Sequence, residues 1–234
     1  ISGGALVRGA LSDSDGLLDI NISKGTLETR HTNQLNVTGL TVGADGVLLA
    51  AFDPSNPTGG GFRVNGAANL ATGAELGVRF TGLLTGPQRF TVIQADTLNI
   101  GTLDQTSLTT NSPYLYVVSS GSNVAAGQVY IDARRRTAAE AGMIAAESSV
   151  FDAFYGGVSA NSALLAAYLG ETSRDGFFNL YEQMLPDHSG GPLMSLSSGV
   201  DAVTRALTGR NASAAEGETS AWVQEINFYA DKDK

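Results

Sequence analysis

The sequence predicts a mainly β fold: a right-handed parallel β-helix, capped at its C-terminal end and followed by a short α-helical region and one isolated strand. Three observations lead to this prediction. Short apolar–polar alternation, broken by Gly turns, occurs twice between Leu35 and Phe80. The apolar period changes from two to 3.6 after Thr137, and alternation returns once more at Trp222.

The repeat between Leu35 and Phe80 aligns Gly39 with Gly66 and Gly46 with Gly73, so its copies lie 27 residues apart (66 − 39 and 73 − 46). Short strands joined by tight turns at such a period are typical of a β-solenoid. The chain contains 29 glycines in 234 residues, as expected if many tight turns join short strands.

Composition excludes several classes of protein. A 16% share of charged residues and a mean hydropathy of +0.01 fit neither a disordered chain nor a helical membrane protein. The formal net charge of −9 argues against a nucleic acid partner, and the lack of cysteine excludes disulfide scaffolds and thiolate chemistry. The sequence contains no signal peptide and starts at Ile1 without Met, so we expect a piece of a longer protein.

Residues 1–133 are expected to consist of strands and turns. The strands richest in β-branched and aromatic residues are Arg89–Ala95, Tyr114–Val118 and Gln128–Asp132. Between the two copies of the repeat, Asp53–Gly61 contains two prolines and three glycines, which predict a loop that leaves one coil.

The last predicted coils are the most aromatic part of the solenoid. An uncovered coil leaves N–H and C=O groups free to pair with another chain, so this end needs a cover. We therefore predict a cap that starts the folding of the solenoid, with the candidate residues Phe90, Val92, Tyr114, Tyr116 and Tyr130.

Three consecutive arginines, Arg134–Arg136, follow the last predicted strand. Two interpretations are open for this run. It could contact acidic lipids, or it could form a charged edge that blocks further strand pairing, and we expect the second.

The apolar period of 3.6 over residues 137–209 predicts α-helices. Gly170 and Pro186 are placed to end two of them, and Thr172 with Asp175 fits a capping box. The helices are too short to cross a bilayer, so we expect them to pack on one another or to line a tunnel. Their predicted apolar faces carry Met143, Ile144, Val150, Phe151, Phe154, Leu164, Leu165, Tyr168, Leu169, Phe177, Phe178, Tyr181, Met184, Leu185, Leu193, Leu196, Val200, Val203 and Leu207.

A small polar stretch, residues 210–220, is predicted to be a linker. Residues 221–234 then begin as a strand that carries Trp222, Ile226 and Phe228 on one face and mostly polar residues on the other. An apolar face with aromatic residues near its ends is typical of a membrane β-barrel strand. One strand cannot form a barrel, so its partner strands would lie outside this sequence.

No residue set predicts a catalytic, cofactor-binding or metal site. Asp187–Ser189 contains the residue types of a hydrolase triad, but consecutive residues cannot place the base between nucleophile and acid. Ser195–Gly199 lacks the Gly that a nucleophile elbow requires before its Ser. His31 has no neighbouring ligands, Asp13–Gly16 is half a calcium loop, and Gly59–Gly61 lacks the Lys of a phosphate loop.

Taken in order, these segments resemble the monomeric (type Va) autotransporters of Gram-negative bacteria over the whole chain. The stretch from Phe62 to Ala95, with Ser112–Leu115 and Ile131–Arg134, is similar to the terminal coils of their secreted passenger, so that 62–133 would be the autochaperone region. Leu180–Pro186 resembles the helical segment before the barrel, and Ala221–Gln224 resembles the first barrel strand.

The resemblance implies a non-enzymatic stem that folds first, nucleates vectorial folding and secretion of the passenger, and joins it to the barrel. It implies the cell surface and outer membrane as location. The implied partners are the chain's own barrel and the barrel-assembly machinery, without cofactors, and self-association could occur through strand edges. The alternatives are an adhesin surface, with the 53–61 loop as candidate, and a polysaccharide-acting enzyme. The enzyme requires two of Arg8, Lys24, Arg63 and Arg79 to converge with carboxylates.

Overall fold

The structure is a computed structural model that describes residues 1–11 and 17–185. The chain divides into two units, Ile1–Gln183 and Met184–Lys234. The strands of the first unit are β1 (Ala5–Gly9), β2 (Asp19–Thr29), β3 (Leu35–Val37), β4 (Gly39–Phe52), β5 (Phe62–Leu70), β6 (Glu75–Phe80), β7 (Gln88–Ile100), β8 (Tyr116–Asn123) and β9 (Gln128–Arg135). Its α-helices are α1 (Gln105–Thr110), α2 (Ala138–Ala141), α3 (Ala145–Gly157), α4 (Ser162–Gly170) and α5 (Arg174–Met184), which reaches one residue into the second unit.

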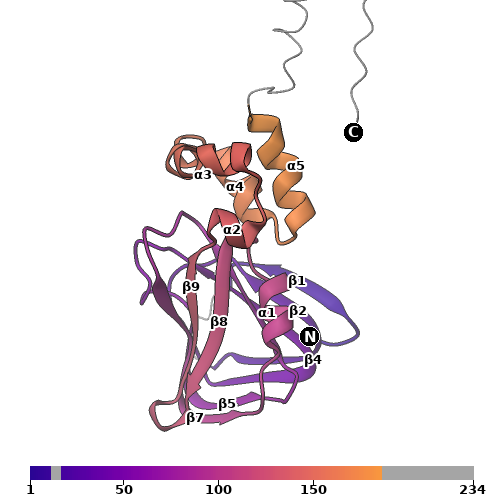
Figure 1. The fold of residues 1–234 in the computed structure, drawn as a ribbon. Helices are drawn as coiled ribbons and strands as arrows, with labels where there is room; N and C mark the ends of the chain where they lie inside the picture. Colours follow the sequence, from indigo (N-terminus) through magenta and orange to yellow (C-terminus); the bar gives the residue numbers. More distant parts are fainter. Residues whose placement is uncertain (12–16, 186–234) are drawn as a thin grey trace, which may run out of the picture. The chain divides into compact units, whose positions relative to one another are not determined.

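The described strands form one curled, open sheet in the order β1-β2-β4-β5-β7-β9-β8, with β3 beside β5 and β6 beside β4 (Figure 1). All pairs from β1 to β7 are parallel. The strand β9 is antiparallel to both β7 and β8. The mainly β class with a following helical region is therefore confirmed, but the sheet is mixed, because a hairpin of β8 and β9 adds antiparallel pairs to the parallel ones.

The first half of the sequence repeat is confirmed by the strand register. Leu35 pairs with Phe62 and Val37 with Val64, which is the predicted separation of 27 residues (62 − 35 and 64 − 37). Further along, Val47 pairs with Glu75, a separation of 28 (75 − 47), so the predicted match of Gly46 with Gly73 is wrong by one residue. A residue is inserted near the bend of β5, where the regular pairing is interrupted.

The core consists of apolar side chains that line up across neighbouring strands. Leu27 pairs with Leu48 and Leu48 with Leu76, and these residues are 2%, 0% and 1% exposed. Fully burying a leucine side chain stabilises a fold by about 1.5–3 kcal/mol. Similar rows on the successive parallel strands therefore supply much of the stability of the sheet.

The predicted helices pack on one another through an aromatic cluster. Phe154 lies 4.7 Å from Tyr168 and 5.0 Å from Tyr181 between ring centroids, and Phe177 lies 5.6 Å from Tyr181. Figure 1 shows α2 directly after β9, with α3, α4 and α5 gathered beyond that end of the sheet. No helix in the described ranges is long and apolar enough to cross a membrane.

Three details of the predicted helices need correction. Met143 lies in the turn after Gly142, whose φ of 70° ends α2, so it does not belong to the face of α3. Val150 is half-buried, whereas Phe151 faces the cluster. At α5, the hydroxyl of Ser173 accepts the amide hydrogen of Gly176, one residue later than the predicted cap at Thr172. Gly170 ends α4 as predicted.

Candidate functional site

A ladder of aromatic rings runs through the end of the sheet where the cap was predicted. Phe90 lies 5.1 Å from Phe52 and 5.1 Å from Phe80 between centroids, and Phe80 lies 5.1 Å from Tyr116, edge to face. Phe90 and Tyr116 are 0% and 1% exposed, and Val92, also predicted for the cap, is fully buried. Each such aromatic pair contributes about 0.5–1.5 kcal/mol beyond the burial of its surface.

The other two predicted cap residues lie outside this ladder. The half-buried Tyr114 places its ring 5.5 Å from that of Phe177 in α5, so it joins the sheet to the helices. Tyr130 lies on the outer face of β9, where it packs over Gly121, because a Cβ there would lie 2.6 Å from the tyrosine ring. The guanidinium of Arg89 covers the same ring at 3.7 Å. Tyr130 therefore stabilises the hairpin from outside rather than filling the core.

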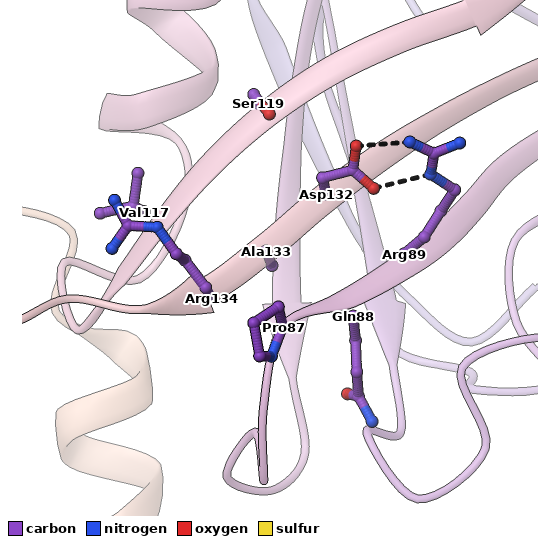
Figure 2. A pocket seen from close by; sticks show the side chains of 8 residues that line it. All are labelled: Pro87, Gln88, Arg89, Val117, Ser119, Asp132, Ala133 and Arg134. Atoms are coloured by element: carbon purple, nitrogen blue, oxygen red, sulfur yellow. Dashed lines mark hydrogen bonds and ion pairs between the residues drawn. The ribbon is translucent and has the colours of Figure 1, made fainter.

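A shallow hollow of about 390 Å³ lies beside this outer face (Figure 2). Arg89 donates two hydrogen bonds of 2.7 Å to Asp132, and this hydrogen bonding raises the pKa of Arg89. Arg134, on the rim, pairs with Glu140. Both cations of the hollow are therefore already neutralised by carboxylates of the same chain, which does not favour an anion-binding or acid–base site. The lining residues are Pro87, Gln88, Arg89, Val117, Ser119, Asp132, Ala133 and Arg134.

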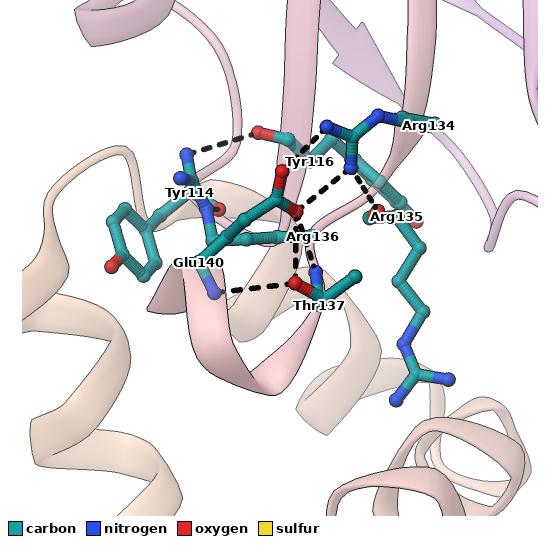
Figure 3. Close-up of polar contacts among 7 residues, drawn as sticks. All are labelled: Tyr114, Tyr116, Arg134, Arg135, Arg136, Thr137 and Glu140. Carbon is teal, nitrogen blue, oxygen red and sulfur yellow. Dashed lines mark hydrogen bonds and ion pairs between the residues drawn. The ribbon is translucent and has the colours of Figure 1, made fainter. Parts of the chain in front are cut away.

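The arginine run after β9 contacts the chain itself (Figure 3). Arg134 makes hydrogen bonds of 2.8 and 2.6 Å to Glu140, which also accepts the amide hydrogen of Thr137. These bonds lower the pKa of Glu140. Arg136 donates to the carbonyl of Tyr114 at 2.8 Å and covers its ring at 4.4 Å. The expected charged edge is therefore wrong in its detail: these guanidiniums hold the start of the helical region.

Arg135 is enclosed by side chains of α3. Its guanidinium lies 4.2 Å from the ring centroids of both Phe151 and Tyr155, donates to the carbonyl of Phe151 at 3.1 Å, and pairs with Asp152 at 2.8 Å. A second hollow of about 600 Å³ lies beside it. It is lined by Leu83, Leu84, Thr85, Gly86, Arg135, Tyr155, Gly156 and Ser159.

Two of the basic residues named for the enzyme alternative do converge. Arg8 lies 2.9 Å and Arg79 4.0 Å from the same carboxylate oxygen of Glu28, which is 6% exposed. Burial lowers the pKa of Arg79. Arg79 also donates to the carbonyls of Val78 and Asn111, so most of its donor capacity serves the chain's own backbone. The arrangement fits a partly buried structural ion cluster.

The loop Asp53–Gly61 is packed against the sheet. The carboxylate of Asp53 accepts from the amide and hydroxyl of Ser55, hydrogen bonding that lowers the pKa of Asp53. Gln88 donates to the carbonyl of Pro54 at 3.1 Å. Gly61 has a φ of 81°, and a Cβ there would lie 2.4 Å from the carbonyl oxygen of Thr91. The remaining exposed side chains are those of Ser55, Asn56 and Thr58.

The other candidate residues are not brought together into a site. The Nδ1 of His31 lies 2.9 Å from the carbonyl oxygen of Asn33, and its ring packs edge-on against Phe62. Within residues 1–11 and 17–185, no group of three or more His, Asp or Glu residues is placed to hold a metal ion. Several predictions lie outside the described residues: Asp13–Gly16, Pro186, Asp187–Ser189, Ser195–Gly199, the last predicted helix, the linker 210–220, and the strand with Trp222, Ile226 and Phe228.

The chain has no significant match among protein-family models, curated proteins or solved structures.

Proposed function

We propose that residues 1–133 are the last coils of a right-handed parallel β-helix, and that the chain is the C-terminal stem of an autotransporter passenger. In this role it nucleates vectorial folding and secretion of the passenger across the outer membrane of a Gram-negative cell and joins it to a barrel. The stem is mechanical and catalyses no reaction.

The observation that carries this proposal is the regular advance of the parallel pairs. Partner strands follow each other along the chain by 20 residues at β1–β2 (27 − 7), 27 at β3–β5 (62 − 35) and 30 at β5–β7 (100 − 70). Such an advance is expected when each turn of chain lies on the preceding one. Parallel crossovers are right-handed in nearly all sheets, which favours a right-handed coil.

The two edges of the sheet differ in a way that supports a direction of growth. Among the described strands, β1 pairs only with β2, and its Leu6 and Val7 are 56% and 41% exposed. At the opposite edge, Gln105 accepts the amide hydrogen of Ser120 in β8 at 3.1 Å and donates back to its carbonyl. A side chain that pairs with edge backbone blocks further strand addition, whereas β1 remains open to it. Further coils would therefore stack on β1.

Surface display tests this function. A reporter fused before Ile1, with an outer-membrane barrel supplied after Lys234, is expected to reach the cell surface. Deletion of residues 84–133 removes Phe90, Tyr116 and the hairpin, and should leave the reporter inside the cell. The exposed Val124, at 57% exposure, provides a control, because Val124→Ser should not change display. Undiminished display of the deletion variant would contradict the proposal.

A polysaccharide-acting enzyme is the second candidate, because Arg8 and Arg79 converge on Glu28 as that function requires. Release of reducing ends from surface polysaccharides by the full chain, and its loss in Glu28→Gln, would favour the enzyme over the stem. An adhesin would instead retain a partner that is lost when Ser55, Asn56 and Thr58 are replaced by alanine.

A further inference from the structure

The connection between β6 and β7 depends on hydroxyl groups from two other parts of the chain. Leu84, in this connection, is 2% exposed. Its amide donates to the hydroxyl of Tyr116 in β8 at 3.2 Å, and its carbonyl accepts from the hydroxyl of Tyr155 in α3 at 2.7 Å. Both backbone groups of a buried residue are therefore satisfied by tyrosine side chains.

The two tyrosines complete a ring of hydrogen bonds. Their hydroxyl oxygens lie 3.4 Å apart. Because Tyr155 uses its proton on the carbonyl of Leu84, Tyr116 is the donor between the two hydroxyls. Burial raises the pKa of both tyrosines, so both hydroxyls stay protonated and able to donate at neutral pH.

The sheet in turn holds α3 in place for this contact. Arg135, the last residue of β9, lies between the rings of Phe151 and Tyr155 and donates to the carbonyl of Phe151. Tyr155 therefore cannot swing away from Leu84 without losing its contact with the guanidinium. The position of α3 is determined by the end of β9 as well as by the other helices.

A third contact ties the remaining helices to the sheet. The amide of Tyr114 donates to the carbonyl of Glu171 after α4 at 2.8 Å, and its hydroxyl donates to the carbonyl of Ala141 in α2 at 3.3 Å. Its ring packs against Phe177 in α5. Residues close to the sheet end thus contact all four helices from α2 to α5.

We propose that α2–α5 act as a folding cap of the sheet, and that Tyr155 is the residue that positions the β6–β7 connection. This assigns a folding role to a segment that was expected to be only a linker. The helices bring their own aromatic core and so can fold as a unit. Without Tyr155, the carbonyl of the buried Leu84 would lack this partner, and an unsatisfied buried acceptor is strongly disfavoured. The proposal depends on contacts within residues 1–183 and not on secretion.

Two matched tyrosine variants test the cap. Tyr155→Phe removes a hydroxyl that bonds across to the sheet, to Leu84, at 2.7 Å. Tyr181→Phe removes one that bonds within the helical region, to the carbonyl of Glu147, also at 2.7 Å. Hydrogen exchange is measured by mass spectrometry on the full chain, with far-UV circular dichroism to verify that each variant folds.

The expected result is distinct for each variant. Tyr155→Phe should raise amide exchange about fivefold to tenfold in the connection 81–87, which lies 71 residues away in the chain, as well as in α3. Tyr181→Phe should raise it in the helices alone. Arg135→Gln should reproduce the Tyr155→Phe pattern, because it frees the ring that carries the hydroxyl.

Three outcomes would overturn the cap. The connection 81–87 could be unchanged in Tyr155→Phe, the two tyrosine variants could give the same pattern, or Arg135→Gln could affect α3 only. A loss of surface display without these changes would bear on the proposed stem and not on the cap, so the two proposals can fail separately.

Discussion

Single glycines at the end of the sheet provide space that no other residue could leave. Gly127, in the β8–β9 turn, has a φ of 65°, in the left-handed region that residues with a Cβ rarely adopt. A Cβ there would lie 2.0 Å from the carbonyl oxygen of Ala95. The carbonyl of Gly127 also accepts the amide hydrogen of Ala95 at 2.8 Å. The hairpin can approach β7 this closely only because the residue is glycine.

Gly127→Ala is therefore expected to lower the free energy of unfolding by about 1–3 kcal/mol, from backbone strain and the displaced β7 carbonyl. Urea unfolding followed by circular dichroism measures the change. Gly86→Ala is the matched control, because a Cβ at Gly86 would have no atom within 4 Å. Equal stability of the two variants would show that the hairpin does not need this close approach.

At the scale of the element, alternation and glycine spacing were sufficient to predict where strands occur and that Leu35 pairs with Phe62. They could not predict the one-residue shift before Val47, because a bulge changes the register without changing the alternation on either side. The hairpin β8–β9 was missed for a related reason. Strand direction depends on the turn at Asn123–Gly127, and a short apolar stretch is the same in either direction.

The contacts of the helices were less predictable still. The period of 3.6 identified Phe154, Tyr168 and Tyr181 as members of apolar faces, and all three are buried. It could not indicate that Tyr155, on another face of α3, bonds to Leu84, because nothing local in the sequence relates residues so far apart. A polar hydroxyl among apolar residues was the one signal available, since a buried tyrosine usually needs a partner for its hydroxyl.

The start of the helical region should be sensitive to acid. Hydrogen bonds from Arg134 and Thr137 lower the pKa of Glu140 from its ordinary value of 4.5. A carboxyl with a lowered folded-state pKa stabilises the fold above its unfolded pKa, and this contribution is lost as the pH falls through the folded-state pKa. Glu140→Gln should therefore lower the thermal midpoint at neutral pH, and its difference from the wild type should shrink below pH 4.5.

Thermal unfolding followed by circular dichroism over a range of pH tests this. Thr137→Ala is the control, because it removes the capping hydroxyl but leaves the bidentate pair of Arg134 with Glu140. It should be less stable at every pH while keeping most of the acid dependence. An acid dependence that persists unchanged in Glu140→Gln would assign the effect to other carboxylates.

At the scale of the whole unit, the sheet and the helices have separate cores joined by few contacts. The sheet buries rows of leucine and the Phe52–Phe90 ladder, whereas the helices bury six aromatic rings among themselves: Phe151, Phe154, Tyr168, Phe177, Phe178 and Tyr181. Two cores of this kind can unfold separately or together. Which of the two occurs depends on the polar contacts of Leu84, Tyr114 and Arg135.

Alkaline pH offers a way to weaken the helical core selectively. Burial raises the pKa of Tyr168 and of Tyr181 to about 12, from an ordinary value of 10.0. Between these values the unfolded chain loses protons that the folded helices keep, so stability is full below pH 10 and falls as the pH rises towards 12. The free energy of unfolding in urea, followed by circular dichroism, should decline over this window, and less steeply in Tyr181→Phe. If the helices cap the sheet, strand and helix signals should be lost in one transition at each pH, because the sheet end depends on Tyr155. Separate transitions, with the sheet unaffected by the ionisation of the helical tyrosines, would mean that the two cores are independent.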